Sequence, residues 1–143
     1  MDKELRLIVS RRCNYDCYFC HGEGVEKGTE EVFSSDDYKF LVDFCKRKYG
    51  WDTVTLTGGE PLIREDILDI VNNLKELGVK ITVVSNGELI DRKMPCFEGV
   101  ERLNVSIHSL DDSTYDKIVQ RKGKLPRVIY NLSQLRNLNK KID

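Results

Sequence analysis

Leu5-Arg6-Leu7-Ile8-Val9-Ser10 leads through two arginines into Cys13-Asn14-Tyr15-Asp16-Cys17-Tyr18-Phe19-Cys20. The first run is short and rich in branched apolar residues, so it predicts a β-strand. The second run places three cysteines within eight residues, close enough for their thiolates to ligate one metal centre. A [4Fe–4S] cluster usually takes four cysteines, so a loop with three leaves one iron open to another ligand.

Two other metal sites fit the same residues. Cys17-Tyr18-Phe19-Cys20-His21 has the C-x-x-C-H spacing of covalent haem attachment. The charged residues 1–4 show no signal peptide for export, and Met94 is the sole internal methionine, which argues against haem. A Cys3His zinc site that includes His21 stays open, although no second C-x-x-C knuckle is present.

The other cysteines do not form a recognisable pattern. Cys45 and Cys96 are isolated in the sequence and are expected to pack as small buried hydrophobic residues. A disulfide framework usually has an even cysteine count and a secreted context, and this chain has five cysteines. We therefore expect reduced thiols and a cytoplasmic protein.

Composition narrows the class of protein. The length of 143 residues predicts a single domain spanning 1–143, with a hydrophobic core and, at 33% charged residues, a highly charged surface. The net charge of −1 gives no general basic field for nucleic acid. No apolar stretch approaches the ~20 residues that span a bilayer, so no membrane partner is expected.

The rest of the sequence alternates strand-like and helix-like segments. An exposed loop is expected from Gly22 to Glu31. Further strands are predicted at Thr53–Thr57, Val79–Ser85 and Leu103–Ile107. Helices are predicted from the caps at 34–37 to near Gly50 with Phe40, Leu41, Phe44 and Cys45 as the apolar stripe, from Pro61 to Gly78, from Asp111, and over Pro126–Leu138.

This alternation predicts an α/β fold with a parallel sheet and right-handed crossovers. A polar or glycine-rich cluster follows each predicted strand. These clusters are the cysteines, Gly58-Gly59-Glu60-Pro61, Asn86-Gly87 and His108-Ser109. The carboxyl ends of parallel strands meet at one edge, where α/β proteins place their chemistry, so we expect the four clusters to converge there.

These residues resemble the radical S-adenosylmethionine (SAM) superfamily in the C-x-x-x-C-x-x-C loop and the Gly-Gly-Glu-Pro turn. The resemblance implies that Cys13, Cys17 and Cys20 bind three irons of a [4Fe–4S] cluster. SAM would chelate the fourth iron and be split reductively into methionine and a 5′-deoxyadenosyl radical. It also implies an electron donor of the flavodoxin or ferredoxin type.

The resemblance also implies a set of SAM contacts. Gly58 and Gly59 lack Cβ atoms and would let the backbone approach the methionine amino group closely. The Glu60 carboxylate could accept a hydrogen bond from that ammonium group. The remaining family contacts fall on Pro61, Phe19, Ser106, Ser85 and Asn86. Two purely structural interpretations stay open: a helix-entry turn for Gly-Gly-Glu-Pro, and a strand hydroxyl facing a helix for Ser106.

Within the superfamily the sequence is most similar to the N-terminal part of the GTP 3′,8-cyclases of molybdenum cofactor biosynthesis, archaeal type. Leu56-Thr57-Gly58-Gly59-Glu60-Pro61-Leu62-Ile63-Arg64 carries this resemblance. It implies that Arg6 contacts GTP, since a guanidinium suits a triphosphate or a guanine edge; a surface arginine on the first strand is the other interpretation. Thr55 stands where that family has a GTP-binding arginine.

A closed (β/α)8 barrel needs ~250 residues, so the resemblance implies a partial, TIM-like barrel of about four parallel βα units. The chain is then a naturally short member, a degenerate relative or the N-terminal part of a larger enzyme. The open sheet edges are expected to be covered by a partner chain or by a homodimer. A non-catalytic iron–sulfur module, or an enzyme acting on a peptide, an RNA or a glycyl-radical partner, stays open.

Overall fold

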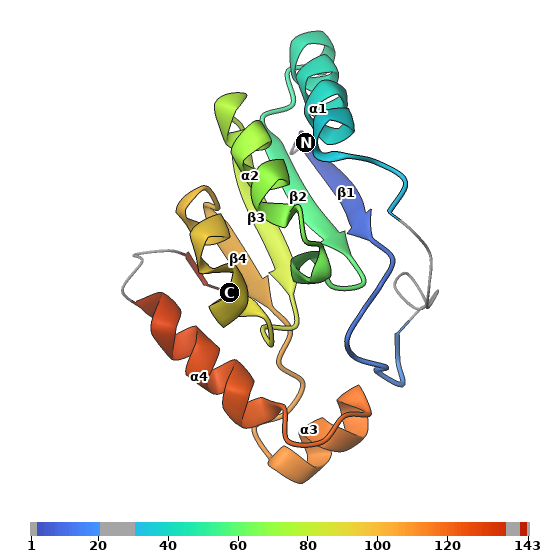
Figure 1. Ribbon diagram of the computed structural model, residues 1–143, viewed down its shortest axis with the longest axis vertical. Coiled ribbons are helices and arrows are strands. Elements are labelled where there is room, and N and C mark those ends of the chain that lie inside the picture. Colours follow the sequence, from blue (N-terminus) through green and yellow to red (C-terminus); the bar gives the residue numbers. More distant parts are fainter. Residues whose placement is uncertain (1–2, 21–30, 137–140, 143) are drawn as a thin grey trace.

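The computed structural model describes residues 3–20, 31–136 and 141–142 (Figure 1). His21 and nearly all of the loop expected from Gly22 to Glu31 lie outside the described residues. The elements follow one another as β1 (Glu4–Ser10), α1 (Ser35–Tyr49), β2 (Thr53–Gly58), η1 (Pro61–Ile63), α2 (Ile67–Glu76), β3 (Lys80–Ser85), η2 (Ile90–Glu98), β4 (Arg102–Val105), α3 (Asp112–Val119), α4 (Leu125–Leu135) and β5 (Lys141–Ile142), where η marks a 3₁₀ helix.

The sheet is parallel throughout, with the strands in sequence order from β1 to β5. One register row joins Leu7, Leu56, Val83 and Leu103 across four strands, and all four side chains are buried. The prediction of a partial barrel of parallel βα units is therefore confirmed. The short strand β5, which pairs with β4, was not predicted.

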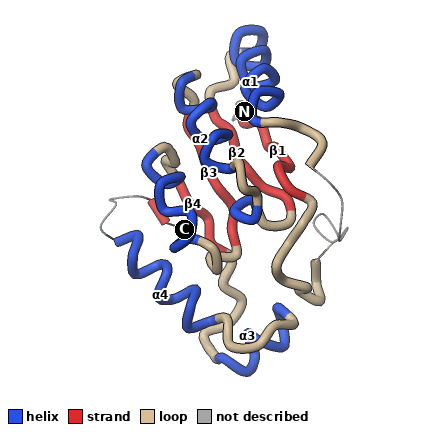
Figure 2. The backbone as a smooth tube through the Cα atoms, in the orientation of Figure 1, coloured by secondary structure: helices blue, strands red, loops and turns tan. Residues whose placement is uncertain are grey.

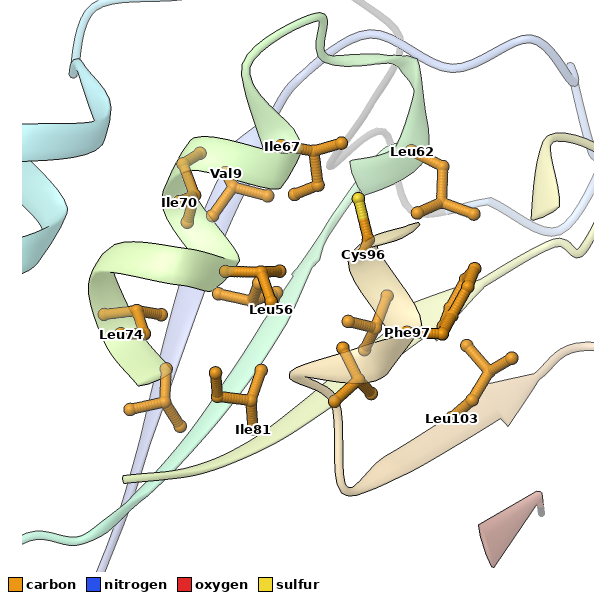
Figure 3. Close-up of a cluster of buried hydrophobic side chains, with 14 of the residues drawn as sticks. Val9, Leu56, Leu62, Ile67, Ile70, Leu74, Ile81, Cys96, Phe97 and Leu103 are labelled. Atoms are coloured by element: carbon orange, nitrogen blue, oxygen red, sulfur yellow. The ribbon is translucent and has the colours of Figure 1, made fainter. Parts of the chain in front are cut away.

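Helices α1 and α2 pack on the same face of the sheet (Figure 1). Ile67, Ile70 and Leu74 of α2 are fully buried against residues of the sheet, such as Leu56 and Ile81 (Figure 3). The predicted burial of Cys96, and likewise of Cys45, is confirmed. The opposite side chains of β1, including Arg6 and Ile8, are exposed.

Helix α1 begins and ends as predicted but buries a different face. Ser34 and Asp37 form a reciprocal capping box, and Gly50 ends the helix in the left-handed conformation. The predicted apolar stripe is wrong except for Cys45, because Phe40 is 72% exposed and Leu41 and Phe44 are also exposed. The buried face consists of Tyr38, Val42 and Cys45.

Tyr38 decides which face of α1 is buried. Its hydroxyl donates a hydrogen bond of 3.2 Å to the carbonyl of Ile8. Its ring lies 5.6 Å from the guanidinium carbon of Arg64, a cation–π contact. Because apolar residues occupy more than one side of this helix, periodicity alone could not select the side that these contacts fix.

The single helix predicted from Pro61 to Gly78 is wrong, because Arg64 interrupts it with an extended backbone. The buried Arg64 guanidinium donates to the carbonyls of Val9 and Phe33 and to both carboxylate oxygens of Asp66. These partners lie on three separate segments, and reaching them requires the chain to leave the helical path. The structure accordingly has η1, a break and then α2.

Other boundaries shift by a few residues. β4 ends at Val105, so Ser106 lies one residue beyond the strand instead of within it. β3 begins at Lys80, and α4 ends at Leu135. None of the helices in the described ranges is long and apolar enough to cross a membrane.

Truncating a buried side chain and truncating an exposed one should change the free energy of unfolding by very different amounts. Leu56→Ala removes a fully buried side chain and should lower the free energy of unfolding by about 2–5 kcal/mol. Phe40→Ala, on the exposed side of α1, should change it by less than about 0.5 kcal/mol. Denaturant unfolding of the two variants measures this, and a loss for Phe40→Ala as large as that for Leu56→Ala would contradict the assignment of the buried face.

Candidate functional site

The loops that follow β1 to β4 gather at one end of the sheet (Figure 2). The cysteine loop follows β1 and rests on α3 through two backbone hydrogen bonds. The amides of Asp16 and Tyr18 donate to the carbonyls of Val119 and Ile118, each at 3.2 Å. Arg121, just after α3, adds an ion pair with Asp16 at 2.5 Å. The last turn of α3 therefore supports the loop.

A buried aromatic pair completes this contact. Tyr15, between the first two cysteines, packs edge-on against Tyr115 of α3 with ring centroids 6.4 Å apart. Both rings are buried, and Cys13 and Cys17 pack against the same cluster. Aromatic pairs in this orientation are favourable beyond the area they bury, so the pair fixes the loop between its first two cysteines.

All three cysteines of the loop are free thiols. Burial is the main cause that raises the pKa of Cys13 to about 11, and the nearby acidic groups Glu60, Cys17 and Cys20 contribute to the same rise. Burial also raises the pKa of Cys17, with Cys20 as the next contributor. Cys13 and Cys17 are half-buried, whereas Cys20 is exposed. The positive charge of a bound metal centre is what would keep them as thiolates.

The donor set of the loop is three thiols, and a cubane takes one thiolate at each of several separate irons. Within residues 3–20, 31–136 and 141–142, no three Cys, His, Asp or Glu side chains are grouped so that they could hold a metal ion. The assignment of the three cysteines as cluster ligands stays a prediction. The zinc interpretation depends on His21, which lies outside the described residues.

The glycine turn after β2 lies directly against the end of β1. Gly58 has φ +126°, and a Cβ atom added there would lie 2.2 Å from the carbonyl oxygen of Ser10. The amides of Gly59 and Glu60 donate to the carbonyls of Ser10 and Arg12, at 2.8 and 2.9 Å. The backbone of this turn therefore packs closely against the segment just before Cys13, and the predicted approach of the two glycines to the methionine amino group stays a prediction.

Glu60 is fully buried and already has three hydrogen-bond donors. Its carboxylate accepts from the amide of Leu62 at 3.0 Å, the hydroxyl of Ser85 at 2.9 Å and the amide of Asn86 at 2.7 Å. Burial raises the pKa of Glu60 to about 7, and the three donors work against that rise. The structure thus gives Glu60 the role of connecting the glycine turn to β3, and its contact with an ammonium group stays a prediction.

Ser85 and Asn86 extend this connection. The buried Ser85 hydroxyl also accepts from the amide of Gly87 at 3.0 Å. The side-chain nitrogen of Asn86 donates to the side-chain oxygen Oδ1 of Asn14 in the cysteine loop at 2.8 Å. Three strand ends are therefore joined by hydrogen bonds.

Of the remaining predicted site residues, Ser106 and Phe19 lie at the end of the sheet that carries the cysteine loop, whereas Arg6 does not. The amide of Ser106 donates to the carbonyl of Ser85 at 3.0 Å, so Ser106 lies at the same end of the sheet. Phe19 is 46% exposed, and its ring contacts that of His108 at 4.7 Å between centroids. Arg6 lies four residues before the end of β1, beside Thr55 in the register, and is not brought to the cysteine loop.

The sequence analysis missed Glu88, a buried carboxylate just beyond Asn86-Gly87. It accepts hydrogen bonds from Asn14 of the cysteine loop and from Lys124 of the α4 N-terminus. Both partners lie at least 36 residues away in sequence. No local pattern could have identified this contact.

Comparison with known proteins assigns the family. The Radical SAM superfamily matches residues 7–142, so the chain belongs to this superfamily. The [4Fe–4S] cluster and SAM predicted above are the cofactors of this family.

Among curated relatives, the "Probable GTP 3′,8-cyclase" of Saccharolobus solfataricus is 38% identical over 120 residues, covering 81% of this chain and 38% of that protein. The protein of the same name from Aeropyrum pernix is 39% identical over 130 residues, covering 85% of this chain and 36% of that protein. The chain thus spans less than two fifths of the length of these relatives.

Solved structures show the same fold. Streptococcus suis SuiB bound to the precursor peptide SuiA has a TM-score of 0.84 at 21% identity, covering 99% of this chain and 32% of that one. The same protein bound to S-adenosylmethionine has a TM-score of 0.78 at 20% identity, covering 99% of this chain and 31% of that one.

The close approach at Gly58 predicts that Gly58→Ala destabilises the protein by about 2–4 kcal/mol, because the new methyl group would overlap the carbonyl of Ser10. Gly123→Ala is the matched control, since Gly123 also has positive φ but has open space around its Cβ position; it should cost about 1 kcal/mol. Thermal unfolding of both variants distinguishes overlap from backbone strain. Equal losses would show that contact with β1 is unimportant.

Proposed function

We propose that this chain binds a [4Fe–4S] cluster through Cys13, Cys17 and Cys20 and reductively cleaves SAM bound at the open iron. The observation that carries the proposal is the joining of the cysteine loop to the glycine turn and to the end of β3. Gly59 contacts Ser10, and Asn86 contacts Asn14, through direct hydrogen bonds. The ligand loop and the proposed SAM-binding turn are thereby held as one unit.

The proposed SAM contacts differ in how exposed they are. Gly58 and Gly59 are half-buried and offer backbone atoms at the turn. Phe19 presents an exposed aromatic face for an adenine ring, and Ser106 presents a half-buried hydroxyl. Pro61, Glu60 and Ser85 are buried and support the turn, and together with Asn86 they remain proposed SAM contacts.

The chemistry is a one-electron reduction. With a cluster held by Cys13, Cys17 and Cys20, transfer of one electron to the sulfonium of SAM would break the bond between sulfur and C5′ and give methionine and a 5′-deoxyadenosyl radical. A low-potential donor of the flavodoxin or ferredoxin type supplies the electron in turn. The chain's own contribution is to hold both groups in a fixed relation beside the sheet.

The finer part of the proposal is a reaction of the GTP 3′,8-cyclase type, in molybdenum cofactor biosynthesis. Its support is the name of the relatives, which match this chain over about 38% of their length. Arg6 is the residue proposed to contact GTP. Its neighbour Thr55, where that family has arginine, donates its hydroxyl hydrogen bond to Glu4, so this chain offers less positive charge there.

The proposal includes a covering partner for the edge of β1, either another chain or a second copy. The described residues place no strand on the outer side of β1. Ile8, Phe33 and Phe40 are exposed there, beside a groove of about 500 Å³. Open parallel edges are normally paired or covered, which supports this part of the proposal.

Cys17→Ala should abolish the cluster, whereas Cys45→Ala should retain it, because Cys45 is buried in α1 away from the loop. Anaerobic reconstitution followed by iron analysis measures this, with about four irons per chain expected for the wild type and for Cys45→Ala. Equal loss in both variants would refute the ligand assignment. A colourless wild-type protein that retains stoichiometric zinc would refute the proposal itself.

Release of 5′-deoxyadenosine under a strong reductant, measured with and without GTP, tests the activity. The proposal predicts cleavage of SAM, stimulated by GTP if the cyclase reaction is the correct one. A cluster-loaded protein that forms no 5′-deoxyadenosine would instead favour a non-catalytic or partner-dependent module. Cleavage that is indifferent to GTP would reject the cyclase part alone.

A further inference from the structure

Glu88 connects two parts of the chain that meet beside the cysteine loop. Its side chain is 8% exposed, which is unusual for a carboxylate. One oxygen accepts from the side-chain amide of Asn14 at 2.6 Å, and the other from the ammonium of Lys124 at 2.6 Å. Lys124 is the N-cap residue of α4, so a single carboxylate bridges the cysteine loop and this helix.

The Asn14 side chain is held at both ends. Its nitrogen donates to Glu88, and its oxygen accepts from Asn86 at 2.8 Å. Asn86 in turn accepts, through its side-chain oxygen, from the amide of Glu88 at 3.0 Å. This closed set leaves Asn14 with one orientation. Because Asn14 directly follows Cys13, fixing its side chain fixes the backbone that carries the first cysteine.

Helix α4 also holds the backbone at Glu88 through hydrogen bonds from its side chains. The fully buried Asn131 donates to the carbonyls of Gly87 and Glu88, at 2.9 and 2.8 Å. Arg127 also donates to the Glu88 carbonyl, at 3.2 Å, and pairs with Asp91. Lys124, Arg127 and Asn131 therefore hold the turn after β3 from one face of α4 and fix the position of the Glu88 carboxylate.

We infer that Glu88 is a positioning residue for the iron–sulfur site, acting through Asn14 and held in place by Lys124. This inference rests on the proposed function. Residues that orient metal ligands from outside the coordination sphere contribute strongly to metal retention, typically 10–100-fold. Here the orienting carboxylate lies in the turn after β3, 74 residues from Asn14 in the sequence, and Lys124 at the start of α4 holds it in place.

The charge of Glu88 is essential to this role. A carboxylate can accept from Asn14 and Lys124 at the same time, because both of its oxygens are acceptors. A glutamine of the same shape has one acceptor oxygen and one NH₂ group. In Glu88→Gln, whichever donor meets the NH₂ group loses its hydrogen bond, so either Asn14 or Lys124 is released.

The test measures how fast the anaerobically reconstituted protein loses iron to a chelator. Glu88→Gln and Lys124→Met should each release iron about tenfold faster than the wild type. Lys124→Arg keeps the positive charge and should restore retention. The double variant should lose iron no faster than the worse single variant, because both changes break one connection. The electron paramagnetic resonance (EPR) signal of the reduced cluster should shift in Glu88→Gln.

Lys39→Met is the matched control, since it removes a 2.5 Å ion pair with Glu76 between α1 and α2, away from the cysteine loop. It should leave the iron loss rate and the EPR signal unchanged. Circular dichroism of each variant confirms that it is folded. If Glu88→Gln fails to fold, Lys124→Met and its arginine counterpart still decide the question.

The outcomes separate this inference from the proposed function. A wild type that takes up no cluster overturns both. A wild type that holds a cluster, with folded Glu88→Gln and Lys124→Met variants that lose iron at the wild-type rate and give the wild-type EPR signal, overturns the inference about Glu88 alone. Faster loss in Lys39→Met, equal to that in Lys124→Met, would also overturn it, since the effect would then be one of general stability.

Discussion

The whole site depends on Glu60, a fully buried residue that joins the ends of three strands. Its amide donates to Arg12 beyond the end of β1, and it directly follows the glycines that end β2. Its carboxylate accepts from Ser85 and Asn86 at the end of β3. A buried carboxylate is costly unless hydrogen-bond donors satisfy it. Separating these strand ends would remove the donors of Glu60, so its burial holds the strand ends together.

The cysteine loop is consequently fixed from both sides before any cofactor binds. The glycine turn and the β3 end hold its beginning through Ser10, Arg12 and Asn14. The α3 helix holds its middle through Tyr15 and Asp16. A site whose ligands are already oriented loses less conformational entropy when it is filled. The third cysteine is the exposed member of the loop.

Local patterns were sufficient for the order of the elements and for the residues at the strand ends. The parallel sheet, the α1 cap and the glycine turn each follow from neighbouring residues. The buried face of α1 and the break at Arg64 could not be predicted, because both are decided by contacts with β1 more than 29 residues away. The same reason explains why Glu88 was missed. Its partners come from the cysteine loop and from α4, which only the folded chain brings together.

The central claim is that one iron of the cluster is left open by the cysteine loop and faces the glycine turn, where SAM binds. Electron–nuclear double resonance of the reduced, reconstituted protein with SAM labelled in its carboxylate and amino groups tests this most directly. The account predicts hyperfine coupling of both labelled groups to the cluster. A four-iron cluster that shows no coupling to bound SAM would contradict it.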